Sequence, residues 1–256
     1  RLPLDPRLGR MLVEAGRRGV TWDVLPIVAA LAIPDVRERP ADKQAEADGL
    51  HRRFWSSEGV QPGQPADGER DPSDIAALWR LWDYLRRQRY ELSGNAFRRM
   101  CRDEYLNFLR IREWQDLVSQ LREVIGELGL DTTAADDPDR RRAQAREPRP
   151  ASGHVPDWAS IHTAILSGLL SHVGLIDARS LAAAPARKGR RPIADYLGAR
   201  GARFAIQPGS ASAKATPPLV MAVELVETTR LWARTVAPVE AAWVEQVGEH
   251  LLTRSY

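Results

Sequence analysis

Apolar residues recur every three or four positions through the first half of the chain, the pattern of helices with one buried face. Val24, Ile27, Val28 and Leu31 have this spacing, and Pro34 follows them as a stop. Ser73 is a candidate N-cap for a second helix, whose apolar positions include Leu78. No strand pattern competes in this half. We therefore expect a helical bundle over residues 1–130.

Two further helices are predicted in the bundle. One spans about residues 95–109. The other begins near Arg112 and ends at Gly129, a typical C-cap. Its apolar stripe consists of Trp114, Leu117, Val118, Leu121, Val124, Ile125 and Leu128.

Two segments have the composition of poor core formers. Residues 56–72 carry three glycines and three prolines and read as a surface insertion. Residues 131–156 combine an acidic pair, three consecutive arginines and four prolines. Low hydrophobicity and dense charge indicate a flexible linker there, which protease should cut first.

Beyond the linker the period changes to that of short strands. A helix over about 158–170 leads into candidate strands at 172–176, 203–206, 219–226 and 230–236, and a last helix spans about 240–252. Short strands in about 100 residues predict a small β-barrel over residues 157–256. Strand counting leaves both a five-stranded OB-fold and an SH3-like barrel open.

The charge balance is slightly positive and dominated by arginine. The net charge is +3, and only Lys43, Lys188 and Lys214 among the 37 basic residues are lysines. Codon bias in a GC-rich genome can produce this excess. Forked guanidinium groups also suit phosphate contacts better than ammonium groups. The total alone does not identify nucleic acid as the partner.

No self-contained active site is visible. The sequence lacks the glycine-rich Walker loop with its lysine, and it lacks an Asp-Glu-Ala-His run for magnesium. The five histidines are scattered, and Cys101 lies on the apolar arc of its helix. We expect no catalytic or metal-binding residue and no ATP hydrolysis by this chain. The single cysteine fits a reducing cytoplasm, and no apolar run is long enough to span a membrane.

Polar residues on two bundle helices form candidate RNA-binding faces. In the helix over 95–109, Asn95, Arg98 and Arg99 lie opposite an arc that contains Phe97 and Cys101. Gln115 and Arg122 lie opposite the stripe of the next helix. Such faces are often only solvated. The alternative is a surface that contacts the phosphates of a single strand.

The strand from residue 230 carries a sharper pattern. Period-two alternation places Arg230, Trp232 and Arg234 on one face, a cation–aromatic–cation arrangement that could stack a base. Alternatively, Trp232 packs inside and the arginines reach past it to water. The loop over 209–214, with its small residues and Lys214, is a weak phosphate-binding cue.

Several runs resemble DEAH-box RNA helicases of the HrpA type. They include LPLDPRLGRM at residues 2–11, ALAIPDVRERP at 30–40, SGNAFRRMC at 93–101 and NFLRIREWQDL at 107–117. In the second half, LSGLLSHVG at 166–174, PGS at 208–210 and VELVETTRLW at 223–232 also match. The resemblance covers nearly the whole chain except residues 56–72 and 131–156. Gln207 departs from many eukaryotic relatives, which have histidine.

The resemblance implies the C-terminal helicase-associated "ratchet" bundle followed by an OB-fold, with residues 1–12 leaving a winged helix. ATP and Mg²⁺ would belong to absent motor domains, and the chain itself would need no cofactor. The expected partners are single-stranded RNA and the motor and winged-helix domains of the same polypeptide, in a monomer. The alternative is a docking scaffold that regulates the motor without touching RNA. The candidate RNA contacts are Asn95, Arg98, Arg99, Asn107, Arg110, Gln115, Arg122, Arg203, Ser210, Lys214, Arg230, Trp232 and Arg234.

Overall fold

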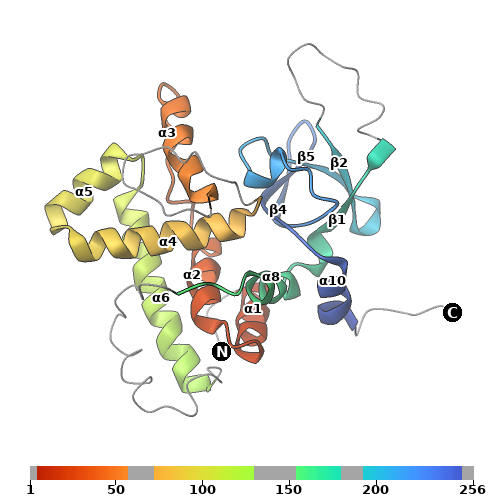
Figure 1. Ribbon diagram of the computed structural model, residues 1–256, viewed down its shortest axis with the longest axis horizontal. Helices are drawn as coiled ribbons and strands as arrows, with labels where there is room; N and C mark the ends of the chain where they lie inside the picture. The colour runs from red at the N-terminus through yellow and green to blue at the C-terminus, as the bar shows by residue number, and fades with distance from the viewer. Residues whose placement is uncertain (1–4, 57–71, 130–153, 180–192, 250–256) are drawn as a thin grey trace.

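The computed structural model describes residues 5–56, 72–129, 154–179 and 193–249 (Figure 1). A group of helices forms one side of the molecule and a small β-barrel the other, with α8 and α10 between and beneath them (Figure 1). The predicted class, a helical bundle followed by an OB-fold-like barrel, is confirmed. The predicted insertion and linker lie almost entirely outside the described residues, so those two predictions remain open.

The helical part contains α1 (Pro6–Arg17), α2 (Thr21–Leu31), α3 (Gln44–His51), α4 (Asp74–Glu91), α5 (Gly94–Asp103) and α6 (Phe108–Leu128). A short 3-10 helix, η1 (Arg52–Trp55), follows α3. Both predicted caps are confirmed: the Ser73 hydroxyl accepts a hydrogen bond from the Ala76 N–H, and Gly129 ends α6 with φ of 62°. α1 and α3 had not been predicted. α1 does carry helical spacing at Leu8, Met11, Leu12 and Ala15, whereas α3 has few apolar residues.

The predicted helix over 95–109 is wrong at its C-terminal end. α5 stops at Asp103, Tyr105 takes a φ of 54°, and α6 begins at Phe108 with Asn107 as its N-cap. The break exists because an extended segment of residues 33–39 pairs with it. The Glu38 N–H donates to the Tyr105 carbonyl at 2.8 Å, and the Asn107 N–H donates to the Val36 carbonyl at 2.7 Å. Such a distant pairing leaves no local signal.

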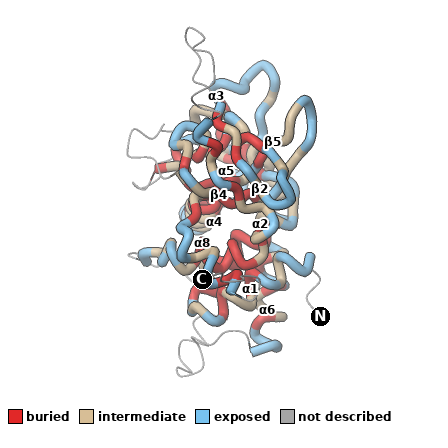
Figure 2. The backbone as a smooth tube through the Cα atoms, turned by 90° about the vertical axis from the view of Figure 1, so that its right-hand side faces the viewer, coloured by how far each residue is buried: buried red, intermediate tan, exposed pale blue. Residues whose placement is uncertain are grey.

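The bundle core forms where α2, α4 and α6 meet. Trp82 and Trp114 pack with ring centroids 5.1 Å apart, and the Trp114 indole N–H donates to the Pro26 carbonyl at 2.8 Å. Cys101 is fully buried, and burial raises the pKa of its thiol to about 12, which agrees with a core role. Buried stretches run through the middle of the molecule, from α4 down to α1 (Figure 2).

The barrel strands are β1 (Val173–Ile176), β2 (Asp195–Gly198), β3 (Arg203–Ile206), β4 (Leu219–Glu227) and β5 (Leu231–Pro238). They close in the order β1-β2-β3-β5-β4, and β3 and β5 are the one parallel pair among the described strands. This order decides between the two barrels left open and gives the OB-fold. β2 was missed because it is short and lacks β-branched residues.

Two backbone features shape the barrel interior. A Cβ on Gly174 would lie 2.3 Å from Cζ of Phe204, so only glycine lets that ring fill the centre. Ala233 and Val236 are three positions apart, yet both pack in the barrel core. Thr235, between them, has a φ of 51°, which turns β5 and exchanges its faces. Odd-numbered residues before Thr235 therefore face the barrel core, as Ala233 does, whereas after Thr235 the even-numbered Val236 faces it.

Helices α8 (Trp158–Ser167) and α10 (Ala241–Gly248) join the two parts, with the short 3-10 helix η3 (Leu170–His172) leading into β1. α8 packs against α1, α2 and α10, and one hydrophobic core runs from Met11 through Ile165 to Met221. The predicted division at residue 157 thus falls at a helix that contacts both parts. No helix in the described ranges has the length and apolar character needed to cross a membrane.

Candidate nucleic-acid interface

A polar cleft of about 650 Å³ separates the bundle from the barrel, and we call it the interdomain cleft. One wall is the N-terminus of α1, the end of α2 and the extended segment 33–39. The other wall is the loop after β3 together with the facing parts of β4 and β5. Its charged lining residues are Arg7, Arg37, Arg39, Arg234, Asp35, Asp74 and Glu224.

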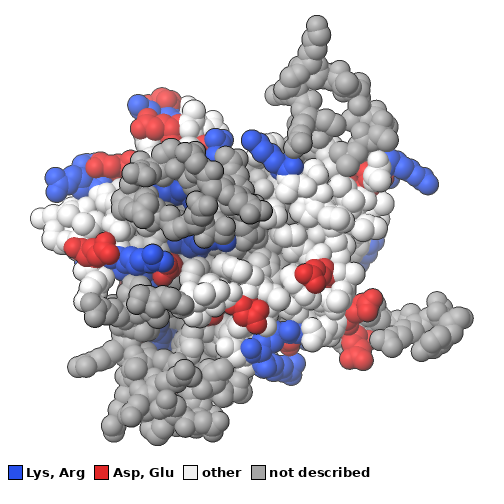
Figure 3. Space-filling model, viewed as in Figure 1, with Lys and Arg blue, Asp and Glu red and all other residues white. Residues whose placement is uncertain are grey.

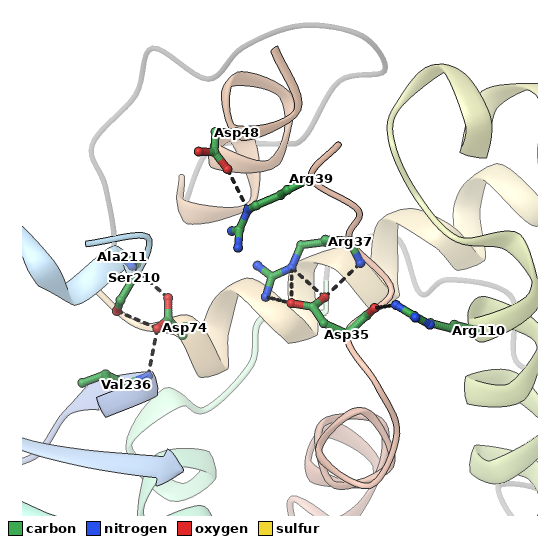
Figure 4. Close-up of polar contacts among 9 residues, drawn as sticks. All are labelled: Asp35, Arg37, Arg39, Asp48, Asp74, Arg110, Ser210, Ala211 and Val236. Atoms are coloured by element: carbon green, nitrogen blue, oxygen red, sulfur yellow. Dashed lines mark hydrogen bonds and ion pairs between the residues drawn. The ribbon is translucent and has the colours of Figure 1, made fainter. Parts of the chain in front are cut away.

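The bundle wall presents two arginines from one extended segment. Nε and a terminal nitrogen of Arg37 donate to the Asp35 carboxylate at 3.0 and 2.9 Å. Nε of Arg39 donates to Asp48 at 2.7 Å. Only one edge of each guanidinium is used in these contacts, and Figure 4 shows the terminal nitrogens of Arg39 and one of Arg37 directed into the space beside the barrel loop.

The electrostatics of this wall keep both Arg37 and Asp35 charged. Burial is the largest single influence and works against the charge of each group, but the partner's opposite charge, the hydrogen bonds between the two groups and other nearby charges together outweigh it. As a result the pKa of Arg37 is raised and the pKa of Asp35 is lowered. A fixed cation at the wall of a polar cleft can contact an anionic group without a proton change.

The barrel wall carries a weaker charge. Arg234 is exposed, and a terminal nitrogen lies 3.9 Å from the Glu224 carboxylate across the β4–β5 pair. Gln207 and Thr235 also line this wall. The loop at Gly209 comes close to the bundle wall, since a Cβ there would lie 3.9 Å from a terminal nitrogen of Arg39.

Asp74, at the start of α4, connects the two walls. Its carboxylate accepts hydrogen bonds from the Ser210 hydroxyl at 2.6 Å and from the Ala211 N–H at 2.8 Å (Figure 4). Ser210 was predicted as an RNA contact, but it is buried and its hydroxyl is directed at this carboxylate. Lys214, from the same predicted loop, is exposed.

The predicted bundle residues fall into two groups. Asn95, Arg98 and Arg99 are exposed on α5, and the Arg98 guanidinium lies 4.9 Å from the Phe108 ring centroid. The other group lies on α6 or at its start. Within it, Arg110 donates to the Asp35 carbonyl at 2.8 Å and so supports the segment that carries Arg37.

Two residues of the second group, Asn107 and Arg122, have side-chain contacts within the fold. Asn107 caps α6, and its amide donates to Glu38 at 2.7 Å. Gln115 is half-buried. The Arg122 guanidinium lies 5.6 Å from the Trp22 ring centroid. If these residues bind RNA, each contact must either remain in the complex or be broken by it.

The stripe on β5 has the predicted geometry. Ala233 is in the barrel core, so Trp232 and Arg234 lie on the outer face, and the Arg230 guanidinium is 5.0 Å from the Trp232 ring centroid. Trp232 is half-buried. Arg230 forms an ion pair with Asp195, and Arg203 donates to Asp177 at 2.9 Å. Arg203 and Arg230 are therefore each paired with a nearby carboxylate.

Surface charge elsewhere is also mixed. On the face in Figure 3, described basic and acidic side chains lie close together at several places, and the centre of the view is mostly uncharged. No group of three potential metal ligands occurs among the described residues. Local geometry, more than total charge, therefore distinguishes the interdomain cleft.

Sequence reasoning missed the cleft's own residues Arg7, Arg37, Arg39 and Gln207. Arg37 and Arg39 lie in the run at 30–40 that carried the family resemblance, and that run was the one signal for them in the sequence. Their position beside the barrel depends on pairing with residues 105–107, which the sequence does not reveal.

Two protein families match this chain. Residues 5–78 match the helicase associated domain (HA2), ratchet-like, and residues 161–251 match the oligonucleotide/oligosaccharide-binding (OB)-fold. The ATP-dependent RNA helicase HrpA of Escherichia coli is 43% identical over 255 residues, which cover 100% of this chain and 16% of that protein. The HrpA homologue of Haemophilus influenzae is 42% identical with the same coverage.

A more distant relative is the human probable ATP-dependent RNA helicase DHX35, 20% identical over 97% of this chain and 28% of its own length. The chain thus spans about a sixth of the bacterial relatives. Both halves of the fold agree with the two matched families. Over its full length the chain is thus similar to part of the HrpA-type ATP-dependent RNA helicases, and its two halves match the helicase-associated and OB-fold families.

Proposed function

We propose that this region grips single-stranded RNA, and that the interdomain cleft holds the strand by its phosphates. The observation that carries the proposal is the pair Arg37 and Arg39, whose guanidinium groups face the barrel wall that presents Arg234. Phosphate contacts of this kind are independent of sequence, which suits an accessory region that holds RNA between steps of a motor.

The longer protein would be an ATP-dependent RNA helicase, in keeping with the names of its bacterial relatives. ATP and Mg²⁺ would act in motor domains outside this chain, and the chain alone would hydrolyse no ATP. We place it in the cytoplasm as a monomer, contacting the motor and winged-helix domains of its own polypeptide. Its role would be to keep one strand from slipping while those domains open and close.

The test is a salt titration of binding to a short oligouridine. For single strands the slope of log affinity against log salt falls by about 0.7 for each phosphate that the protein no longer neutralises. We expect Arg39→Ala to lower the slope by roughly this amount. Arg17→Ala is the matched control, because Arg17 lies on α1 ten residues, about 15 Å, beyond the cleft residue Arg7. Equal slopes for the two variants would contradict the proposal.

Protein docking is the second candidate function. Leu175 and Leu197 are cross-strand neighbours on the outside of the barrel, and they are 55% and 39% exposed. Exposed apolar pairs of this kind favour contact with another domain. Docking need not release counterions, so a chain without salt-dependent RNA binding would support this reading over the first.

A further inference from the structure

Three hydrogen bonds between bundle and barrel converge on one carboxylate. Asp74 is the first residue of α4 and is 7% exposed. Its Oδ2 accepts hydrogen bonds from the Ser210 hydroxyl at 2.6 Å and the Val236 N–H at 2.8 Å, and its Oδ1 accepts one from the Ala211 N–H at 2.8 Å. All three donors belong to the barrel (Figure 4).

The chemistry of this contact requires a carboxylate. Two of the three donors are backbone N–H groups, which cannot be turned around to become acceptors. An asparagine here would direct its own NH₂ group at one of these donors and leave it unpaired. Burial raises the pKa of Asp74, and the three hydrogen bonds oppose that rise. Hydrogen bonds to an ionised group are stronger than neutral ones, so the contact is specific to this residue type.

Neighbouring contacts reinforce the same point of attachment. The Ser73 hydroxyl lies 2.7 Å from Nε2 of His162 on α8. The Ser212 hydroxyl is hydrogen-bonded to the Pro72 carbonyl. The bundle, α8 and the barrel therefore meet at residues 72–74, and Asp74 lies at the centre of that junction.

The donors to Asp74 are next to the barrel residues of the interdomain cleft. Val236 directly follows Arg234 and Thr235, and Ser210 directly follows Gly209. We infer that Asp74 is a positioning residue that fixes the width of the interdomain cleft, so that Arg234 and Gln207 stay opposite Arg37 and Arg39. Its effect on RNA rests on the proposed function, whereas its effect on the distance between the two parts does not.

The geometric test measures that distance without RNA. Spin labels are attached to the 256-residue chain at Tyr90→Cys on α4 and Leu175→Cys on β1, both exposed, whereas Cys101 is fully buried and stays unlabelled. The unmutated junction should give one narrow distance distribution, and Asp74→Asn should broaden or shift it. Asp83→Asn is the matched control, since it removes a carboxylate from the same helix that pairs only with Arg87 among the contacts described. A distribution that stays narrow in Asp74→Asn would overturn the inference.

The functional test uses oligouridine and the salt slope. We expect Asp74→Asn to lower the slope by about 0.7 or more, because a wider cleft lets only one wall contact phosphates at a time. A residue with a merely structural role would reduce the thermal midpoint and leave this slope unchanged below it. If the wild-type chain binds no RNA, the proposed function fails, and the spin-label result still decides the role of Asp74.

A second variant covers the case in which Asp74→Asn does not fold. Ser210→Ala removes one donor and keeps both backbone N–H groups on the carboxylate. We expect a smaller broadening of the distance distribution and faster amide exchange at Ala211 and Val236. Unchanged exchange and an unchanged distribution in Ser210→Ala would contradict the inference.

Discussion

The arginines of the bundle wall and the arginines of the barrel differ in the contacts that their guanidinium groups make. At the cleft, Arg37 and Arg39 use one edge of the guanidinium for a carboxylate and turn the other toward the cleft. On the barrel, Arg203 and Arg230 point at partners on neighbouring strands or loops. An arginine-rich surface is therefore a poor guide to anion binding. The free edge of each guanidinium, and the rigidity of the segment that holds it, decide what it can contact.

The bundle side also contains a buried ion pair. Arg53 is 1% exposed and forms an ion pair with Glu104. The Glu104 carboxylate also accepts a hydrogen bond from the Tyr84 hydroxyl at 2.9 Å. Glu104→Gln would leave the Arg53 charge buried without a counter-charge. We expect a loss of about 3–5 kcal/mol in the free energy of unfolding, measured by urea denaturation.

The neighbouring exposed residue provides the control for that experiment. Asp103→Asn removes a carboxylate that is 60% exposed and pairs with Arg102. Its effect should stay within about 0.5 kcal/mol. If the two variants were equally stable, the buried ion pair would not stabilise the bundle. The bundle and the barrel would then not differ in how much their ion pairs contribute to stability.

Acid should lower the free energy of unfolding through protonation of His51. Burial, with help from the charge of Arg37, lowers the pKa of His51 to about 4 from 6.5. The unfolded chain therefore binds more protons than the folded chain between these values, so stability falls as pH drops from above 6.5 to 4. The full loss is about 3 kcal/mol, from 1.36 kcal/mol per pKa unit. Urea midpoints measured at several pH values should show stability falling with pH, and His51→Gln should remove most of this pH dependence. If the pH dependence persists in His51→Gln, another group causes the loss.

Stacking on the barrel is the next effect in size. Trp232 lies half-buried on the outer face beside Arg230, where a base could cover its ring. We expect Trp232→Ala to weaken oligouridine binding by about 1–3 kcal/mol. Trp232→Phe should retain much of the affinity. Should Trp232→Ala unfold the barrel while Trp232→Phe binds as well as the wild type, the ring serves packing alone.

The smallest expected effects come from the neutralised arginines. An exposed ion pair contributes about 0–1 kcal/mol, so Arg230→Ala should change the salt slope by less than one phosphate's worth. Asp195→Asn removes the partner of Arg230 and should raise RNA affinity, by up to about fivefold. Titrations at two salt concentrations measure both. A large slope change in Arg230→Ala would show that this arginine already contacts phosphate.

The sequence predicted those features whose causes are local. The cap at Ser73, the glycine at the end of α6 and the alternation of Trp232 with Ala233 follow from spacing of a few residues. The OB-fold came from the family resemblance, because strand counting left two barrels open. The chemistry of the β5 stripe was visible, but the carboxylates that pair with it were not.

The remaining features depend on contacts between distant residues. The break before α6 arises because residues 33–39 pair with residues 105–107, and the cleft arises only where two parts of the fold meet. Ser210 lies in a loop of small residues of the kind that binds phosphate. In the structure, however, its hydroxyl donates to Asp74, 136 positions away. No periodicity within either segment contains that information.

The distance along the chain between Asp74 and its partners has a consequence for synthesis. Val236 lies 162 residues after Asp74. At about 5–20 residues per second, the ribosome needs roughly 10–30 s to complete that stretch. During this interval α4 can already form, and its positive N-terminal dipole favours the Asp74 carboxylate in water. The carboxylate loses its water only when the barrel closes, so docking is expected to be a late and separate step in folding.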